Sequence, residues 1–196
     1  MLTFRWRFVV ASLGAILLVS LMLVPESTAD TWGGCSTATE SGCRPDSTLH
    51  TYCYGAGFNS TLEDEADFAM NTSIARDTVM TASFYTTCST ADIKWLDANL
   101  GSTRGDYICL EPFSPFQDNG TCLASRVRLN PTEINQGPND PEDRKKTACH
   151  EAGHSIGFQH GDDKTDCMIN GPIPDTTDQW RTFGGHHITH IADFFG

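Results

Sequence analysis

The stretch HEAGHSIGFQH, at positions 150–160, constrains the fold more than any other part of the chain. His150 and His154 are four residues apart, and residues at that spacing share one face of an α-helix, so they can present two imidazoles to one metal ion. If the helix continued, His160 would lie about 9 Å farther along the axis and point away from that face. The helix must therefore end first. Gly157 can end it, because glycine adopts a positive φ without steric cost.

The three histidines and the neighbouring glutamate together predict a catalytic metal site. Three neutral imidazoles on a zinc ion leave a fourth position open for water, which is the arrangement of a catalytic zinc site. Glu151 follows the first ligand directly, so its carboxylate is expected beside the metal, where it can accept a proton from that water. A shuffled chain of this composition would show the whole pattern about three times in 100,000. The alternative is a helix with ordinary histidines and an incidental glutamate.

The pattern H-E-x-x-H-x-x-G-x-x-H resembles the motif of the metzincin clan of zinc endopeptidases. The residues Cys167, Met168, Ile169 and Asn170 resemble the Met-turn of that clan, whose methionine packs beneath the metal without binding it. The small size and the short spacing to Met168 are similar to the small secreted type typified by snapalysin. That family has an aspartate as third ligand, where this chain has His160.

The resemblance implies an α+β fold of the zincin-like type. It would have a twisted mixed sheet and two main helices, one of them bearing the zinc, in an upper part spanning about 50–160. A small C-terminal subdomain, 161–196, would follow the third ligand. The implied function is a zinc-dependent endopeptidase with one catalytic Zn²⁺ and a protein or peptide substrate.

Residues after the Met-turn are candidates for substrate contact and for a second metal. In metzincins this segment walls the pocket for the substrate side chain after the cleaved bond, which suggests Trp180 and Phe183; alternatively, these two only close the lower core. A Ca²⁺ site at Asp162, Asp163 and Asp166 competes with a solvated acidic loop. Two other functions stay open: a non-catalytic exported zinc-binding protein, and a disulfide-rich structural protein without metal.

The N-terminus has the pattern of a secretory signal peptide over residues 1–29. Arg5 and Arg7 form a basic region, an apolar run follows at 8–24, and small residues at 27–29 form a cleavage site. An uncleaved membrane anchor is the alternative. We expect a secreted, monomeric domain of residues 30–196 that does not contact the membrane after cleavage.

The charge of the secreted domain argues against nucleic acid as a partner. Removing Arg5, Arg7 and Glu26 leaves 11 basic and 24 acidic side chains, for a net charge of about −13. A protein of this sign repels phosphate backbones. Solubility of an exported protein explains the excess more simply than a preference for basic substrates.

All 8 cysteines lie beyond residue 29, and an even number in an exported chain predicts four disulfides. Cys149 precedes the first ligand, and Cys167 precedes the methionine that the resemblance places beneath the metal, so these two are expected to pair. Further pairs are predicted for Cys109 with Cys122 and Cys53 with Cys88, while Cys35 and Cys43 would pin an N-terminal arm. Cys43-Arg44-Pro45-Asp46 is similar to the cysteine switch of matrixins but lacks one residue. Cysteine as a zinc ligand is disfavoured because no C-x-x-C pair occurs.

Hydrophobic periodicity predicts the remaining elements. One helix would begin at a cap on Ser60 or Thr61 and run to about Met80. A second would be capped by Asp140, with Pro141 in its first turn, and would carry the metal ligands. Strands are predicted over 50–58, 84–88, 92–96, 107–110 and 125–130, of which 92–96 could instead be a short helix.

Overall fold

The computed structural model describes residues 43–112, 120–160 and 166–196. These ranges form a mixed α/β fold with one six-stranded, mostly parallel sheet and four α-helices. The predicted signal peptide, Cys35, Asp162 and Asp163 lie outside the described residues.

The sheet is built around its longest strand, β6. Strands β3, β2, β4 and β6 follow one another as parallel neighbours, β1 pairs parallel with the start of β6, and β5 pairs antiparallel with β6. The sheet is thus mixed, as predicted. The strands are β1 (Arg44–Pro45), β2 (Leu49–Tyr54), β3 (Thr81–Phe84), β4 (Ile93–Asp97), β5 (Gly105–Pro112) and β6 (Thr121–Leu129).

Alternating side chains explain the central strands. In β4, Ile93 and Trp95 are buried, so the 92–96 run is a strand and not a short helix. In β6, Val127 and Leu129 are buried while Arg126 and Arg128, which alternate with them, are partly exposed, as the alternation predicts for one buried face.

The first helix, α1 (Ser60–Phe68), differs from the prediction at both ends. The Asn59 side chain caps it by accepting a hydrogen bond from the Thr61 amide at 2.9 Å, so the predicted cap at Ser60 or Thr61 is wrong. The chain continues as a π-helical segment, Ala69–Ile74, and stops well before Met80. Thr78 ends it, because its hydroxyl donates to the Ile74 carbonyl at 2.6 Å and accepts from the Met80 amide at 3.0 Å.

This early stop moves the next strand toward the N-terminus. β3 ends at Phe84, where the predicted strand 84–88 was to begin, so that prediction is wrong. The following residues leave the sheet, and Cys88 meets Cys53 of β2 in a disulfide. The disulfide therefore holds a loop in the place of the predicted strand.

The helix that carries the motif is α3 (Asp140–Ser155), preceded by the short α2 (Pro131–Ile134). Asn139 occupies the cap position, so the cap predicted at Asp140 is wrong by one residue. The Asp140 carboxylate instead accepts a hydrogen bond from the Gly137 amide at 3.1 Å. Pro141 lies in the first turn as predicted, where its missing N–H has no cost.

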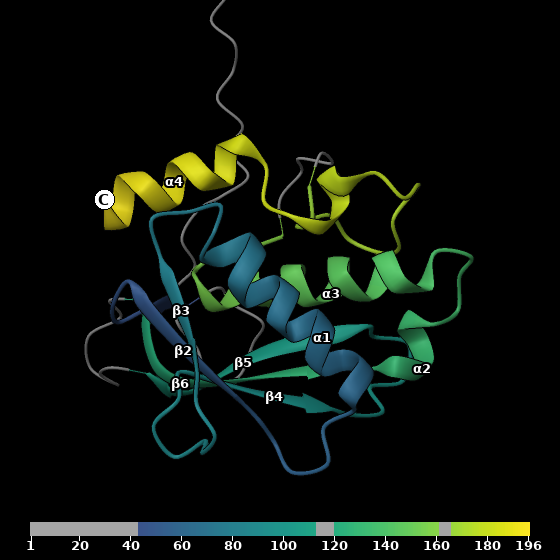
Figure 1. Cartoon of the computed structure of the whole chain (residues 1–196), viewed down its shortest axis with the longest axis horizontal. Helices are drawn as coiled ribbons and strands as arrows, with labels where there is room; N and C mark the ends of the chain where they lie inside the picture. Colours follow the sequence, from purple (N-terminus) through teal and green to yellow (C-terminus); the bar gives the residue numbers. More distant parts are fainter. Residues whose placement is uncertain (1–42, 113–119, 161–165) are drawn as a thin grey trace, which may run out of the picture.

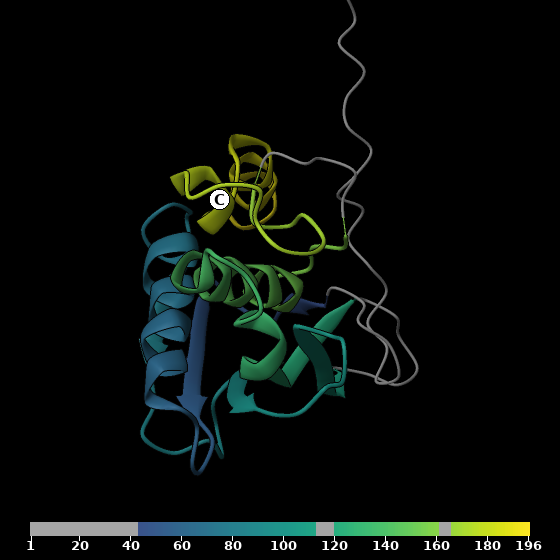
Figure 2. The ribbon, with the colours of Figure 1, turned by 90° about the vertical axis from the view of Figure 1, so that its right-hand side faces the viewer.

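The elements stack in layers around α3. Figures 1 and 2 show α1 and α3 against the sheet, and the C-terminal segment on the far side of α3 from the sheet. That segment contains the 3₁₀ turn Asp178–Arg181 and α4 (Gly185–Phe195). The helix α3 is thus enclosed between the sheet and the C-terminal segment, and most of its second half is buried.

Within the described ranges, no helix is both long enough and apolar enough to cross a membrane.

Candidate metal centre

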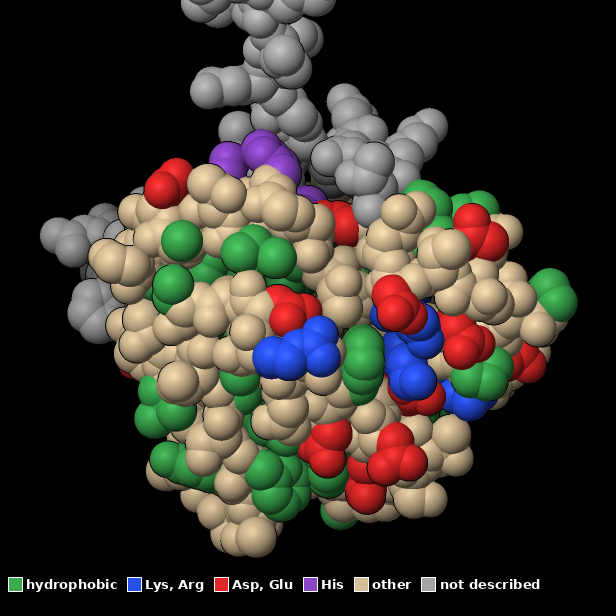
Figure 3. Space-filling view, turned by 45° about the horizontal axis from the view of Figure 1, so that its top comes forward, with side chains coloured by type: hydrophobic (Ala, Val, Ile, Leu, Met, Phe, Trp, Pro, Cys, Tyr) green, Lys and Arg blue, Asp and Glu red, His purple; other side chains and the backbone are tan. Residues whose placement is uncertain are grey.

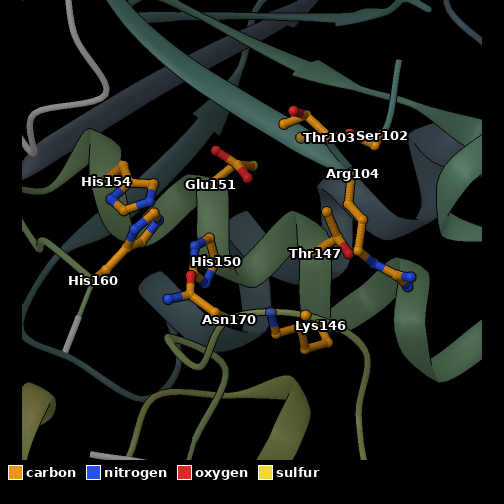
Figure 4. Close-up of a pocket in the computed structure, with 12 residues that line it drawn as sticks. Ser102, Thr103, Arg104, Lys146, Thr147, His150, Glu151, His154, His160 and Asn170 are labelled. Atoms are coloured by element: carbon orange, nitrogen blue, oxygen red, sulfur yellow. The ribbon is translucent and has the colours of Figure 1, made fainter. Parts of the chain in front are cut away.

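Three imidazoles converge at the C-terminal end of α3. His150 and His154 come from consecutive turns of the helix, and His160 returns to them from the loop that follows (Figure 4). Their ligand atoms all lie within 4.8 Å of one another. Gly157 makes this return with φ of 108°, and the Phe158 amide closes the turn onto the Gly153 carbonyl at 3.0 Å. The chain therefore leaves the helix at the position where the motif required it to end.

Backbone carbonyls orient the two helical imidazoles. His150 Nδ1 lies 3.0 Å from the Cys167 carbonyl oxygen, and His154 Nδ1 lies 2.7 Å from that of Phe158. A carbonyl only accepts, so each Nδ1 must carry the proton and donate it. Each ring then directs an unprotonated Nε2 elsewhere, which is the tautomer that a metal ligand needs.

Burial keeps these two rings neutral. It lowers the pKa of His150 well below its usual value, with the Lys146 charge acting in the same direction. It also lowers the pKa of His154, to about 4, against a hydrogen bond to Phe158 that raises it. Protons therefore compete weakly with a metal for either ring at neutral pH. His160, the third member, is exposed to solvent.

Met168 packs against α3 at Gly153, which lies between His150 and His154 in the sequence. Its side chain is fully buried, and a Cβ added at Gly153 would lie only 2.3 Å from its sulfur. A side chain at position 153 would therefore displace the methionine. Phe183 fills the same floor, with a ring carbon 3.1 Å from that added Cβ and its ring 5.6 Å from that of Phe158.

Asp166 ties the Met168 turn to the C-terminal helix. One carboxylate oxygen accepts from the Met168 amide at 2.8 Å, and the other accepts from the Gly184 amide at 2.8 Å and contacts the His187 ring. Both Asp166 and His187 are almost fully buried. These contacts give Asp166 a structural task, and with Asp162 and Asp163 outside the described residues, the Ca²⁺ site stays a prediction.

Three disulfides join the pairs that the sequence suggested. Cys149 and Cys167 are bonded with their Cα atoms 5.9 Å apart, Cys53 is bonded to Cys88, and Cys109 to Cys122. Cys43 is also disulfide-bonded. The first of these bonds connects the residue before His150 to the residue before Met168, and the carbonyl of Cys167 is the one that orients His150.

We expect replacement of Cys149 and Cys167 by alanine to lower the free energy of unfolding by about 3 kcal/mol, the chain-entropy value for a loop of this length. The same double variant should bind zinc more weakly, because the Cys167 carbonyl would no longer be fixed against the His150 ring. Chemical denaturation and competition with a chelator measure the two effects.

The Cys109–Cys122 disulfide provides the control. It joins β5 to β6, closes a loop of similar length, and neither of its cysteines lines the cleft. Its double alanine variant should lose comparable stability and keep its zinc affinity. Equal zinc affinity in both double variants would contradict the orienting role of the Cys149–Cys167 bond.

A cleft of about 210 Å³ opens over the three histidines. Figure 4 shows the Glu151 carboxylate in it, between His154 and the loop before β5. That loop ends at Gly105, where an added Cβ would lie 2.7 Å from a Glu151 oxygen. The absence of a side chain there makes room for the carboxylate. The lining residues are Ser102, Thr103, Arg104, Gly105, Lys146, Thr147, His150, Glu151, His154, His160, Asn170 and Gly171.

The two aromatic residues proposed for substrate contact do not line this cleft. Trp180 packs with Ile169 and Ile173 and donates its indole N–H to Asp175 at 2.8 Å. Phe183 lies in the main core beside Met168. Both side chains are buried in hydrophobic clusters of this structure, and their contact with a substrate stays a prediction.

Sequence reasoning missed most of the other lining residues. Lys146 and Thr147 lie four and three residues before His150, so helical spacing alone could have placed them beside it. Asn170 belongs to the turn after Met168 and could have been found with it. The loop 102–104 gave no such signal, because only the packing of β5 against α3 brings it to the cleft.

The site thus combines three convergent imidazoles, a nearby carboxylate and an open cleft. Comparison with known proteins adds no assignment: no model of a known protein family matches the chain, and no curated protein matches it.

Proposed function

We propose that this chain is a secreted zinc endopeptidase of the metzincin type, with a zincin-like fold. The observation that carries the proposal is the convergence of His150, His154 and His160 beside Glu151 in one cleft. The antiparallel strand next to the cleft, the helix α3 and the buried methionine beneath it support the same conclusion.

The donor set fits zinc. Two of its three imidazoles have their Nδ1 protons directed to carbonyls, which leaves Nε2 for the ion. When bound, zinc supplies a Lewis acid that polarises a carbonyl and lowers the pKa of water toward 7. Zinc would be held by His150, His154 and His160.

Glu151 would move the proton. Its carboxylate lies at the wall formed by Gly105, between His154 and the loop before β5. There it would take a proton from the attacking water onto a carboxylate oxygen and then deliver that proton to the nitrogen of the leaving amine. Because Glu151 is nearly buried, little bulk water competes for the proton.

Strand β5 would align the substrate. Among the described strands β5 pairs only with β6, so its other edge retains backbone donors and acceptors. An extended polypeptide can add to such an edge as a further strand. Gly105 places the start of that edge beside Glu151, so the added strand would carry a peptide bond past the histidines.

The decisive experiment is digestion of an unfolded protein substrate by the purified chain of residues 30–196. We expect cleavage to stop with a zinc chelator and to return when zinc is restored. A zinc-loaded, folded chain that cleaves no substrate would contradict the proposal and favour a non-catalytic zinc-binding protein. A folded chain without bound zinc would exclude both.

A further inference from the structure

A lysine lies at the bottom of the candidate cleft, one helical turn before the first histidine. Lys146 lines the cleft but is only 3 % exposed. Its ammonium donates to the Ile169 carbonyl oxygen, and Figure 4 shows its nitrogen turned toward Asn170. The cleft floor beside the histidines therefore carries a positive charge.

No carboxylate of the described chain forms an ion pair with Lys146. Other cations do have such partners: Arg144 lies 3.4 Å from Glu65, and Arg181 lies 3.6 Å from Glu142. Figure 3 likewise shows basic side chains beside acidic ones on one face of the molecule. An ammonium buried with only a carbonyl contact has unused donor capacity, because it carries three protons.

The other basic side chain of the cleft is already neutralised. Arg104 lies 3.2 Å from a carboxylate oxygen of Asp143 and donates to the carbonyls of Glu133 and Ile134. In Figure 4 its guanidinium points away from the histidines. Lys146 is thus the cation of the lining that faces the cleft without a carboxylate partner.

We propose that Lys146 makes the cleft select substrates with an acidic side chain adjoining the scissile bond. This inference rests on the proposed peptidase function. Four residues of helix separate Lys146 from His150, or about 6 Å along the axis, while successive Cα atoms of a substrate are about 3.8 Å apart. A substrate carboxylate next to the reacting bond can therefore reach the ammonium.

The charge state of Lys146 is compatible with this role. Burial lowers its pKa to about 8, partly opposed by the negative charge of Glu151. The amine stays mostly protonated at neutral pH. The ammonium is already largely desolvated. A charge-assisted hydrogen bond from it to a substrate carboxylate would therefore be stronger than one formed in water.

A purely structural role is the competing explanation, because the Ile169 contact links α3 to the turn after Met168. The two roles differ in what they predict for substrates. A structural tie would affect all peptides equally, whereas a binding charge affects the ratio between acidic and neutral peptides.

The test uses zinc-loaded enzyme and peptides identical except for Glu, Gln or Lys on either side of the cleaved bond. The wild type should have a kcat/KM at least about ten-fold higher for Glu than for Gln at one of these positions. Lys146→Gln should bring this ratio close to one, and Lys146→Glu should favour the Lys peptide. Lys146→Arg keeps the charge and should keep the preference for Glu.

Lys145→Gln is the matched control. It removes the same charge from the next residue, whose ammonium lies over the Phe68 ring at 5.4 Å from its centroid, and it should leave the ratio unchanged. Zinc content and circular dichroism show which variants are folded. If Lys146→Gln does not fold, the Glu-to-Gln ratios of kcat/KM for the wild type and for Lys146→Arg test the inference.

Two outcomes overturn the inference while the peptidase function stands. One is equal cleavage of the Glu and Gln peptides by the wild type; the other is an unchanged Glu preference in folded Lys146→Gln. If zinc-loaded wild type cleaves no peptide and no protein, the peptidase function itself fails, and the selectivity for acidic substrates fails with it.

Discussion

Glu151→Gln should keep its zinc and lose peptide hydrolysis by about 10²- to 10⁴-fold, the contribution of a positioned general base. The substitution preserves the size of the side chain, so the contact with Gly105 should remain. It removes the carboxylate that takes up the proton, and the neutral amide cannot replace it. Initial rates on a fluorogenic peptide, beside the zinc content of the same sample, measure both parts.

Glu142→Gln is a suitable control for this variant. Glu142 belongs to the first turn of the same helix and lies 3.6 Å from Arg181, so its loss changes the charge of α3 without touching the cleft. Its hydrolysis rate should stay within about two-fold of wild type, as expected for a weak surface pair. Near-normal turnover by purified Glu151→Gln would refute the proposed proton transfer.

His160→Ala should weaken zinc binding as severely as His154→Ala, although one ring is exposed and the other buried. Both offer one nitrogen to the same cluster, and the Gly157 turn brings His160 back to it. We expect each loss to exceed the about 10- to 100-fold caused by losing an outer hydrogen bond to a ligand. Titration against a competing chelator gives the affinities.

His190→Ala serves as the comparison for the ligand variants. His190 lies on α4, where its ring stacks against His186 and not against the cleft histidines. Its replacement should leave zinc affinity unchanged. Full zinc occupancy in His160→Ala after dialysis would exclude a three-histidine site.

Local sequence patterns predicted those features of the fold and site that depend on residues close together in the chain. Spacing along one helix placed His150 and His154, and the steric freedom of glycine placed the turn at Gly157. Alternation identified β6, because it has one buried face, whereas the run that forms β4 had left a strand and a short helix open. The cap predicted at Ser60 or Thr61 falls instead on the preceding Asn59, another polar side chain with good capping ability.

The remaining features depend on contacts between distant segments. The contact of Gly105 with Glu151 arises only after β5 has packed on α3, so no local pattern could reveal it. The same holds for Asp166, whose partners Gly184 and His187 lie in the C-terminal segment. The hydroxyl of Thr78 bonds the Ile74 carbonyl where the helical segment ends before Met80, and a pattern of residue hydrophobicity does not register such a contact.

The parallel pairing of the sheet has a consequence for how this chain folds. Parallel neighbours such as β2 and β4 lie far apart in sequence. The disulfide that joins Cys53 of β2 to Cys88, in the loop after β3, spans 35 residues. Contacts of such long range slow folding, because chain entropy is lost before they form. The second half of α3 can become enclosed only when both the sheet and the C-terminal segment have formed around it. Metal capture should therefore be a late event in folding, and the ion would lock an assembled scaffold instead of nucleating it.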